Sequence, residues 1–407
     1  MKSYLEKLLS ITKLLRFICL LPCFQQLLKK ILLSLVLLAV GIGIGFKMPR
    51  GAGLIATIMS FGQGSNQSYS HLKSHQALID FESMLTQGRK MVLADARTEQ
   101  EAIEGMRWLL RVAAMSAEVV GDANAKLPHF QRMDTLVRKV GGDNPDAEYE
   151  RVAIDGRYDY KITGTRGSVS YIGFTITAGE GMNPRRQVAY VNDLMLNPDE
   201  DGNFTLWLTK QKPDQPGDWV EIPEDASGIL VRQYIGDRKT QVLPELNIEI
   251  VGDHPAFQPP TDEEIANAII GTTYAFLKLS TLHQYILPEL LEQHNGFIRA
   301  TSENLGGAIS SEDNLYMIGS YQLEDDEVLV IDVQPPNSRY WNLALETRWH
   351  ETPDYLHRST SLTKEDVKYN DDGSVQFVVS HKDPGHPNWL DTSGHNFGFM
   401  TFRWLDS

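Results

Sequence analysis

The spacing of hydrophobic residues predicts two helices at the start of the body of the chain. The first is expected over residues 71–94. The second begins at Thr98, where Thr98 and Glu101 have the spacing of a capping box. Its apolar residues recur at helical intervals and predict one buried face. That face is expected to contain Ile103, Met106, Leu110, Ala113 and Ala117.

A third helix is predicted between two regions of strands. Thr261 and Glu264 have capping-box spacing, and the helical pattern continues as far as Pro288. His283 lies on the apolar side of this pattern. We interpret it as a buried, hydrogen-bonded histidine of the core.

Short segments rich in β-branched and aromatic residues predict strands in the rest of the body. The Asp201-Gly202 and Asp372-Gly373 pairs are expected to form hairpin turns. The predicted strands cover residues 158–163, 169–177, 204–208, 229–234, 328–333, 340–347, 375–380 and 399–404.

The two strand regions match each other at a nearly constant offset of about 170 residues. The matched pairs are Gly202 and Gly373, Trp219 and Trp389, Arg232 and Arg403, and Tyr171 and Tyr340. This pattern indicates a duplicated β-unit. We therefore expect a mainly β protein of the α+β class, with tandem jelly-roll-like or β-sandwich units, an inserted helix and a helical N-terminal part.

An uncharged apolar run at residues 31–46 lies between Lys29-Lys30 and Lys47. It predicts a transmembrane signal anchor, and the preceding basic residues predict a cytoplasmic N-terminus. The body is then periplasmic, on a single-pass protein of the inner membrane. A long cleaved signal peptide is the alternative. The expected order is 1–50 basic segment and anchor, 51–70 linker, 71–140 helical subdomain, 141–260 first β-repeat, 261–300 connecting helix and 301–407 second β-repeat.

Charge and cysteine content exclude several functions. The net charge is −15, yet the first fifty residues contain eight basic residues and only one acidic residue. The rest of the chain is therefore strongly acidic, which argues against nucleic-acid binding. Both cysteines, Cys19 and Cys23, lie before the body. The body therefore has no disulfide, thiolate metal site or cysteine nucleophile.

The stretch 381–395 has the highest density of chemically capable side chains. His386, Asn388, Asp391 and His395 are absent from the matching loop of the first repeat. His386, Asp391 and His395 are catalytic candidates for acid–base chemistry, with Asp391 orienting His395. Asn388 is a candidate ligand contact. Metal ligation by these side chains and hydrogen bonding within the loop are the alternatives.

Further ligand-binding candidates lie outside this stretch. Asp143 and Asn144 belong to a Gly-Gly-Asp-Asn-Pro-Asp loop that can face a cleft or form a capping turn. Tyr340 and Trp341 can stack on a ligand or lie in the core. Arg403, in the middle of a strand, needs a carboxylate or carbonyl partner, and it can form a buried ion pair or bind an anion.

Several motifs resemble a bacterial family known as domain of unknown function 1214. They occur at residues 141–146, 201–206, 339–341 and 386–395, together with Arg403. The resemblance covers residues 75–407 and implies a β-rich, jelly-roll-like body. It implies no established reaction and assigns no catalytic residue.

The first functional hypothesis is an exported, membrane-anchored accessory or binding protein of the cell envelope, with a carbohydrate or lipid ligand. The alternative is an envelope enzyme that uses the histidines and aspartate of the second repeat. A purely structural role in an assembly is a third reading, and a homo-oligomer is compatible with each. The sequence identifies no cofactor.

Overall fold

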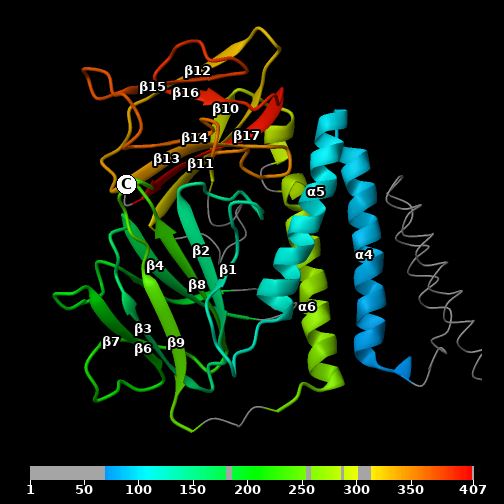
Figure 1. The fold of residues 1–407 in the computed structure, drawn as a ribbon, viewed down its shortest axis with the longest axis vertical. Helices are drawn as coiled ribbons and strands as arrows, with labels where there is room; N and C mark the ends of the chain where they lie inside the picture. The colour runs from blue at the N-terminus through cyan, green and yellow to red at the C-terminus, as the bar shows by residue number, and fades with distance from the viewer. Residues whose placement is uncertain (1–68, 180–185, 254–257, 286–287, 301–312, 406–407) are drawn as a thin grey trace, which may run out of the picture. The chain divides into compact units, whose positions relative to one another are not determined.

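Long helices and β-sheets form separate parts of the body in the computed structural model (Figure 1). The structure describes residues 69–179, 186–253, 258–285, 288–300 and 313–405. The expected anchor at 31–46 lies outside these ranges. Within them, no helix has the length and apolar character needed to cross a membrane.

The three helices that the sequence predicts are present. They are α4 (Lys73–Asp95), α5 (Glu99–Ser116) and α6 (Asp262–Ser280), and α6 packs against both of the others. The Thr261–Glu264 capping box at α6 is complete. At α5, Thr98 accepts from the Glu101 amide at 3.1 Å, but the Glu101 carboxylate accepts from the Arg97 amide instead of closing the box.

The predicted buried face of α5 is wrong at Ile103 and Leu110, whereas Met106 and Ala113 pack against the helical core as expected. The side chains of Ile103 and Leu110 are 58% and 72% exposed. Trp108 is buried instead and stacks on Trp349, with ring centroids 5.1 Å apart. The helix packs through its tryptophan side because Trp349, far away in the sequence, supplies a large aromatic surface there. Periodicity within α5 cannot reveal this partner.

His283 is buried, as predicted, and its Nε2 lies 2.9 Å from Asp95 Oδ2. It belongs to α7 (Leu282–Tyr285), a short turn that follows α6. Its ring meets Trp108 and Trp349 edge-on. This histidine therefore ties the end of the α6 region to the core shared by the helices.

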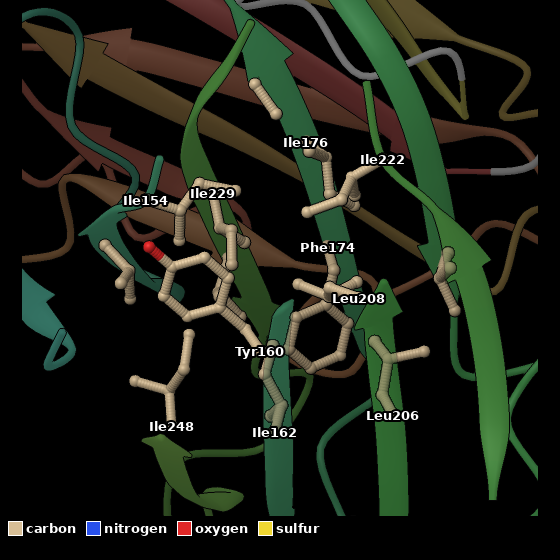
Figure 2. Packing of buried hydrophobic residues seen from close by; sticks show 14 of the residues in the cluster. Ile154, Tyr160, Ile162, Phe174, Ile176, Leu206, Leu208, Ile222, Ile229 and Ile248 are labelled. Atoms are coloured by element: carbon tan, nitrogen blue, oxygen red, sulfur yellow. The ribbon is translucent and has the colours of Figure 1, made fainter. Parts of the chain in front are cut away.

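Two sheets form the first repeat. One has the strand order β1-β2-β8-β4-β5, and the other has the order β7-β6-β3-β9. Figure 2 shows Phe174 and Ile176 of β4 in the same core as Leu206 and Leu208 of β6, so the two sheets share one hydrophobic interior. The strands are β1 (Gln131–Arg132), β2 (Ala147–Ala153), β3 (Asp159–Thr165), β4 (Tyr171–Ala178), β5 (Arg186–Asn192), β6 (Asn203–Thr209), β7 (Asp218–Glu221), β8 (Ala226–Tyr234) and β9 (Glu245–Val251).

The second repeat has the same plan. Its sheets have the orders β10-β11-β17-β13-β14 and β12-β15-β16. The order β2-β8-β4-β5 corresponds to β11-β17-β13-β14, and the parallel pair β6–β7 corresponds to the parallel pair β15–β16. The strands are β10 (Gly296–Ala300), β11 (Asn314–Gln322), β12 (Val328–Val333), β13 (Tyr340–Glu346), β14 (Ser361–Thr363), β15 (Val375–Ser380), β16 (Trp389–Asp391) and β17 (Phe397–Leu405).

The two Asp-Gly pairs form turns, but the turns do not make hairpins. Gly202 and Gly373 have φ angles of +83° and +80°, which glycine adopts at little cost. The strands on either side of each turn, β5 and β6 or β14 and β15, belong to different sheets. Each turn therefore begins a strand after the chain has crossed between sheets.

Candidate functional site

A cavity of about 250 Å³ lies where both repeats meet the helices. Its wall combines residues from β8, β11, α5, α6 and α7 and is largely apolar. The apolar residues include Met115, Val140, Leu230, Leu279, Leu282 and Ile318. Walls of this kind are typical of small-molecule sites, in which a few polar groups fix the orientation of the ligand.

The polar side of the cavity repeats the internal duplication. Tyr149 lies opposite Arg232 in the register of β2 and β8, and Tyr316 lies opposite Arg403 in the register of β11 and β17. All four residues line the cavity. The site is therefore built from equivalent positions of both repeats.

The second repeat adds a network of charged and polar side chains centred on Glu346. Thr401 Oγ1 donates to Glu346 Oε1 at 2.7 Å, and Arg403 Nη2 lies 3.6 Å from the same oxygen. His350 Nδ1 lies 2.8 Å from Glu346 Oε2. Both carboxylate oxygens are therefore occupied, and Glu346 holds the other three side chains in place.

The backbone around His350 has an uncommon conformation. His350 has a φ angle of +53°, in the left-handed region that costs energy for a non-glycine residue. The ring stacks on Phe399 with centroids 4.1 Å apart, and the Gly142 amide donates to the His350 carbonyl at 2.8 Å. These contacts fix the imidazole at the edge of the cavity.

Three cavity-lining side chains have a buried polar atom without a protein partner. These atoms are Arg403 Nη1, His350 Nε2 and Asp134 Oδ1. Leaving a buried polar group unpaired costs about 1–3 kcal/mol. A ligand in the cavity can supply the missing hydrogen bonds.

Burial and neighbouring charges set the protonation of the carboxyl groups. Burial acts to raise the pKa of Glu346, but His350, Arg403 and Thr401 outweigh it and the pKa is lowered. Burial raises the pKa of Asp134 well above its usual range, with a further contribution from Asp143. Burial also raises the pKa of Asp143 to about 6. Near neutral pH Glu346 is therefore ionised and Asp134 is neutral, while Asp143, with a pKa of about 6, is largely ionised.

Two of the ligand-binding residues predicted from the sequence, Arg403 and Asp143, line the cavity. Arg403 forms the ion pair that its mid-strand position requires, and its Nη2 also donates to the Gly142 carbonyl at 2.9 Å. The Asp143 carboxylate accepts from the Thr352 amide at 2.8 Å and from the Thr352 hydroxyl. The loop at 141–146 thus joins the polar edge of the site to the second repeat.

Asn144, Tyr340 and Trp341 lie in the interior, each 2% exposed or less. Asn144 Oδ1 accepts from Asn342 at 2.7 Å, and Asn144 Nδ2 donates to the Tyr340 hydroxyl at 3.1 Å. Trp341 belongs to the hydrophobic core of the second repeat. The structure assigns these three residues packing and bonding roles between or within the repeats.

The four candidates of the 381–395 stretch bond to four different sets of partners. Asp391 pairs with Arg358 at 2.8 Å, and His395 Nε2 lies 2.7 Å from Glu104 Oε2. His386 Nδ1 accepts from the Asn388 amide at 3.2 Å. The Asn388 side chain donates to the backbone carbonyls of Lys368 and Gln376, each at 2.9 Å. In the part of the chain that the structure describes, no three His, Cys, Asp or Glu side chains converge as metal ligands.

His395 lies at a second, smaller cavity of about 170 Å³, away from His386 and Asp391. Burial acts to lower the pKa of His395, but the Glu104 carboxylate outweighs it and the pKa is raised. Asp391 is therefore not the carboxylate that orients this histidine. The catalytic assignment of the three residues stays a prediction.

Sequence reasoning missed Glu346 and His350 as members of one site. In the sequence near these residues, the sign of a shared site is that His350 follows Glu346, the last residue of the buried strand β13, by four positions. The strand registers place Thr177 of the first repeat at the position of Glu346, since Thr177 pairs with Gly228 as Glu346 pairs with Phe399. A comparison of the two repeats at this position would have identified a charged residue that only the second repeat carries.

A solved protein structure resembles the chain over most of its length. A crystal structure of an uncharacterised protein from Burkholderia cenocepacia has 28% identity and a TM-score of 0.77, covering 82% of this chain and 94% of that one. The VPA0106 protein from Vibrio parahaemolyticus has 13% identity and a TM-score of 0.44, covering 74% of this chain and 95% of that one. No curated protein matches the chain.

A family model described as protein of unknown function DUF1214 matches residues 145–237 and 320–407. The first segment contains β2 to β8, and the second contains β12 to β17. These are the two β-repeats, so the match follows the duplication. Both β-repeats therefore match the model of the DUF1214 family, the family that the motifs of the sequence resemble.

Proposed function

We propose that this protein is an exported binding protein of the cell envelope, and that its ligand is a small lipid-like molecule held in the cavity between the repeats. The observation that carries this proposal is the cavity itself, which has apolar walls and three buried polar atoms without partners. Apolar walls favour a lipid over a carbohydrate, because sugar hydroxyls need many hydrogen-bonding groups.

The size of the cavity limits the ligand. A volume of about 250 Å³ equals roughly eight water molecules at ~30 Å³ each. It therefore fits an acyl chain of medium length, or one end of a longer lipid. Such a ligand places its apolar chain against Leu230, Leu279 and Ile318 and its polar end near Arg403.

The location of the protein and the finer architecture are part of the proposal. A signal anchor at residues 31–46 would hold the acidic body on the periplasmic side of the inner membrane, close to envelope lipids. The paired sheets of each repeat support a jelly-roll-like sandwich as the unit of the fold.

Mass spectrometry of small molecules that co-purify with the full-length protein in nanodiscs tests this proposal. The Leu230→Trp variant, which fills the cavity, should lose the bound molecule. Leu356→Trp is a matched control, because Leu356 is 53% exposed. Equal recovery of the molecule from both variants would place its binding elsewhere.

One observation favours an enzyme as the second candidate. His350 has one ring nitrogen bonded to Glu346 and the other unpartnered, which is the arrangement of a general base with an orienting carboxylate. An envelope enzyme should convert the co-purifying molecule during incubation, and Glu346→Gln should abolish the conversion. Recovery of an unchanged molecule would favour the binding protein.

A further inference from the structure

We propose that the cavity recognises a carboxylic acid: its ligand is a medium-chain acyl carboxylate whose head group binds Arg403 and His350. This inference rests on the proposed function, because it names the chemical class of ligand in the same cavity. It also assigns Glu346 as a positioning residue.

The guanidinium of Arg403 supplies the first step of the argument. The side chain is 4% exposed, and its Nη2 is satisfied by the Gly142 carbonyl and the nearby Glu346 carboxylate. Its Nη1 is buried without a partner. A buried guanidinium retains a strong tendency to bind oxygen anions, and carboxylates are well matched to its planar donors.

The imidazole of His350 supplies the second group that can bind a carboxylate. Its Nδ1 is used by Glu346, and its Nε2 is buried without a partner on the wall of the same cavity. This nitrogen can donate to a carboxylate when the imidazole is protonated, or accept from a carboxylic acid when it is neutral. Both forms of a carboxyl group therefore find a partner here.

The wall keeps nitrogen atoms for an anion although it also contains carboxyl groups. Both oxygens of Glu346 are engaged by His350, Thr401 and Arg403, and both oxygens of Asp143 are engaged by Thr352. Burial raises the pKa of Asp134 well above its usual range, so this carboxyl group is neutral near neutral pH. The unpartnered Nη1 of Arg403 and Nε2 of His350 are therefore the nitrogen atoms of the wall that can meet an anion.

The apolar part of the wall determines the chemical character of the ligand beyond its head group. Side chains from three helices and both repeats enclose the space beyond the polar groups. Water-filled space against such a surface is unfavourable, and an aliphatic chain removes it. The combination of one anionic group and a short apolar body describes an acyl carboxylate.

The test compares octanoate with 1-octanol, which has the same chain and no charge, by calorimetry on the full-length protein in nanodiscs. Empty nanodiscs provide the background for partitioning into lipid. Octanoate should bind the protein at least about ten-fold more tightly than 1-octanol, because a charge-assisted hydrogen bond in a buried site contributes on this scale. Arg403→Gln should remove this preference and leave the binding of 1-octanol intact.

Two further variants keep the test informative if Arg403→Gln does not fold. Arg403→Lys retains the charge and should keep part of the preference. Arg358→Gln removes an arginine that pairs with Asp391 outside this cavity and should keep all of it.

Each failure has a distinct meaning. Equal affinities for octanoate and 1-octanol would overturn the carboxylate class and leave a lipid-binding cavity. Butyrate binding as tightly as octanoate would overturn the acyl class, because only the head group would then matter. Binding of none of the three would overturn the inference together with the proposed function.

Discussion

The ring of Tyr340 stacks on the ring of Tyr234, with centroids 5.0 Å apart and planes 12° from parallel. Tyr340 begins β13 in the second repeat, and Tyr234 ends β8 in the first. Tyr171, the counterpart of Tyr340, also stacks on Tyr234, at 5.1 Å. The duplicated tyrosines thus meet on one shared ring at the junction of the repeats.

Truncation of this stack should weaken the junction between the repeats. Tyr340 is fully buried, and removal of a large buried aromatic side chain costs about 3–5 kcal/mol. We expect Tyr340→Ala to lower the free energy of unfolding by this amount in urea titrations. Tyr369→Ala, at a residue that is 41% exposed, is the control and should cost far less. Equal effects of the two changes would contradict the role of the stack.

Loss of the central carboxylate should destabilise the site as a whole. Glu346→Gln leaves His350 and Arg403 buried without their counter-charge, and breaking a buried ion pair costs about 3–5 kcal/mol. The same urea titration should show a loss of this order. Glu82→Gln, on the exposed side of α4, should change stability by less than about 0.5 kcal/mol. A neutral effect of Glu346→Gln would show that the network is not held by charge.

Gly105 in α5 tests the corrected orientation of this helix. A Cβ at this position would lie 2.5 Å from Val92 Cγ1 and 2.9 Å from the Trp349 ring. Gly105→Ala should therefore lower the melting temperature, although alanine favours a helix over glycine by about 1 kcal/mol. Ile103→Ala, on the exposed face, should leave the melting temperature nearly unchanged. Stabilisation by Gly105→Ala would contradict the close packing of α5.

The stability of the body should fall as pH rises from about 4.5 to about 7. Burial raises the pKa of Glu351 to about 7 and that of Asp143 to about 6. In this interval the folded state binds more protons than the unfolded state, so each rise in pH favours unfolding. Glu351→Gln removes one of these groups and should flatten the decline, as measured by unfolding free energies at pH 4.5, 6 and 7.5.

The control for this pH dependence is Glu292→Gln, at an exposed residue. It should leave the slope between pH 4.5 and 7.5 as it is in the unaltered protein. If Glu351→Gln leaves the slope equally unchanged, the buried carboxyl group does not take up a proton in this range.

The duplication could be predicted from the sequence because its landmarks have local causes. Trp219 and Trp389 stand on the parallel strands β7 and β16, and their indole nitrogens bond to Thr209 and to the carbonyl of Ser380. These are equivalent neighbours. When both repeats need the same turn, strand and buried contact, the residues that form them recur in the sequence at a constant offset.

The site could be predicted only in part. Arg403 was recognisable because a charge in the middle of a strand demands a partner. His350 was not, because its role depends on Glu346, Phe399 and the Gly142 amide, which are brought together by tertiary packing. For the same reason, the density of histidines at 381–395 could not reveal that His395 pairs with Glu104 and that His386 bonds to the Asn388 amide. Composition there says nothing about which neighbours each side chain meets.

Strand β17 lies between β11 and β13; all nine of its residues pair with β11, and seven of them also pair with β13. It also carries Arg403 and Thr401 to the polar edge of the site. On the ribosome, the strand that completes the middle of this sheet is therefore the last of the described strands to be synthesised. Until it arrives, β11 and β13 each expose an unpaired edge that invites wrong pairing or proteolysis. A chain released before β17 would lack both the central strand of this sheet and the two side chains, Thr401 and Arg403, that this strand contributes to the cavity wall.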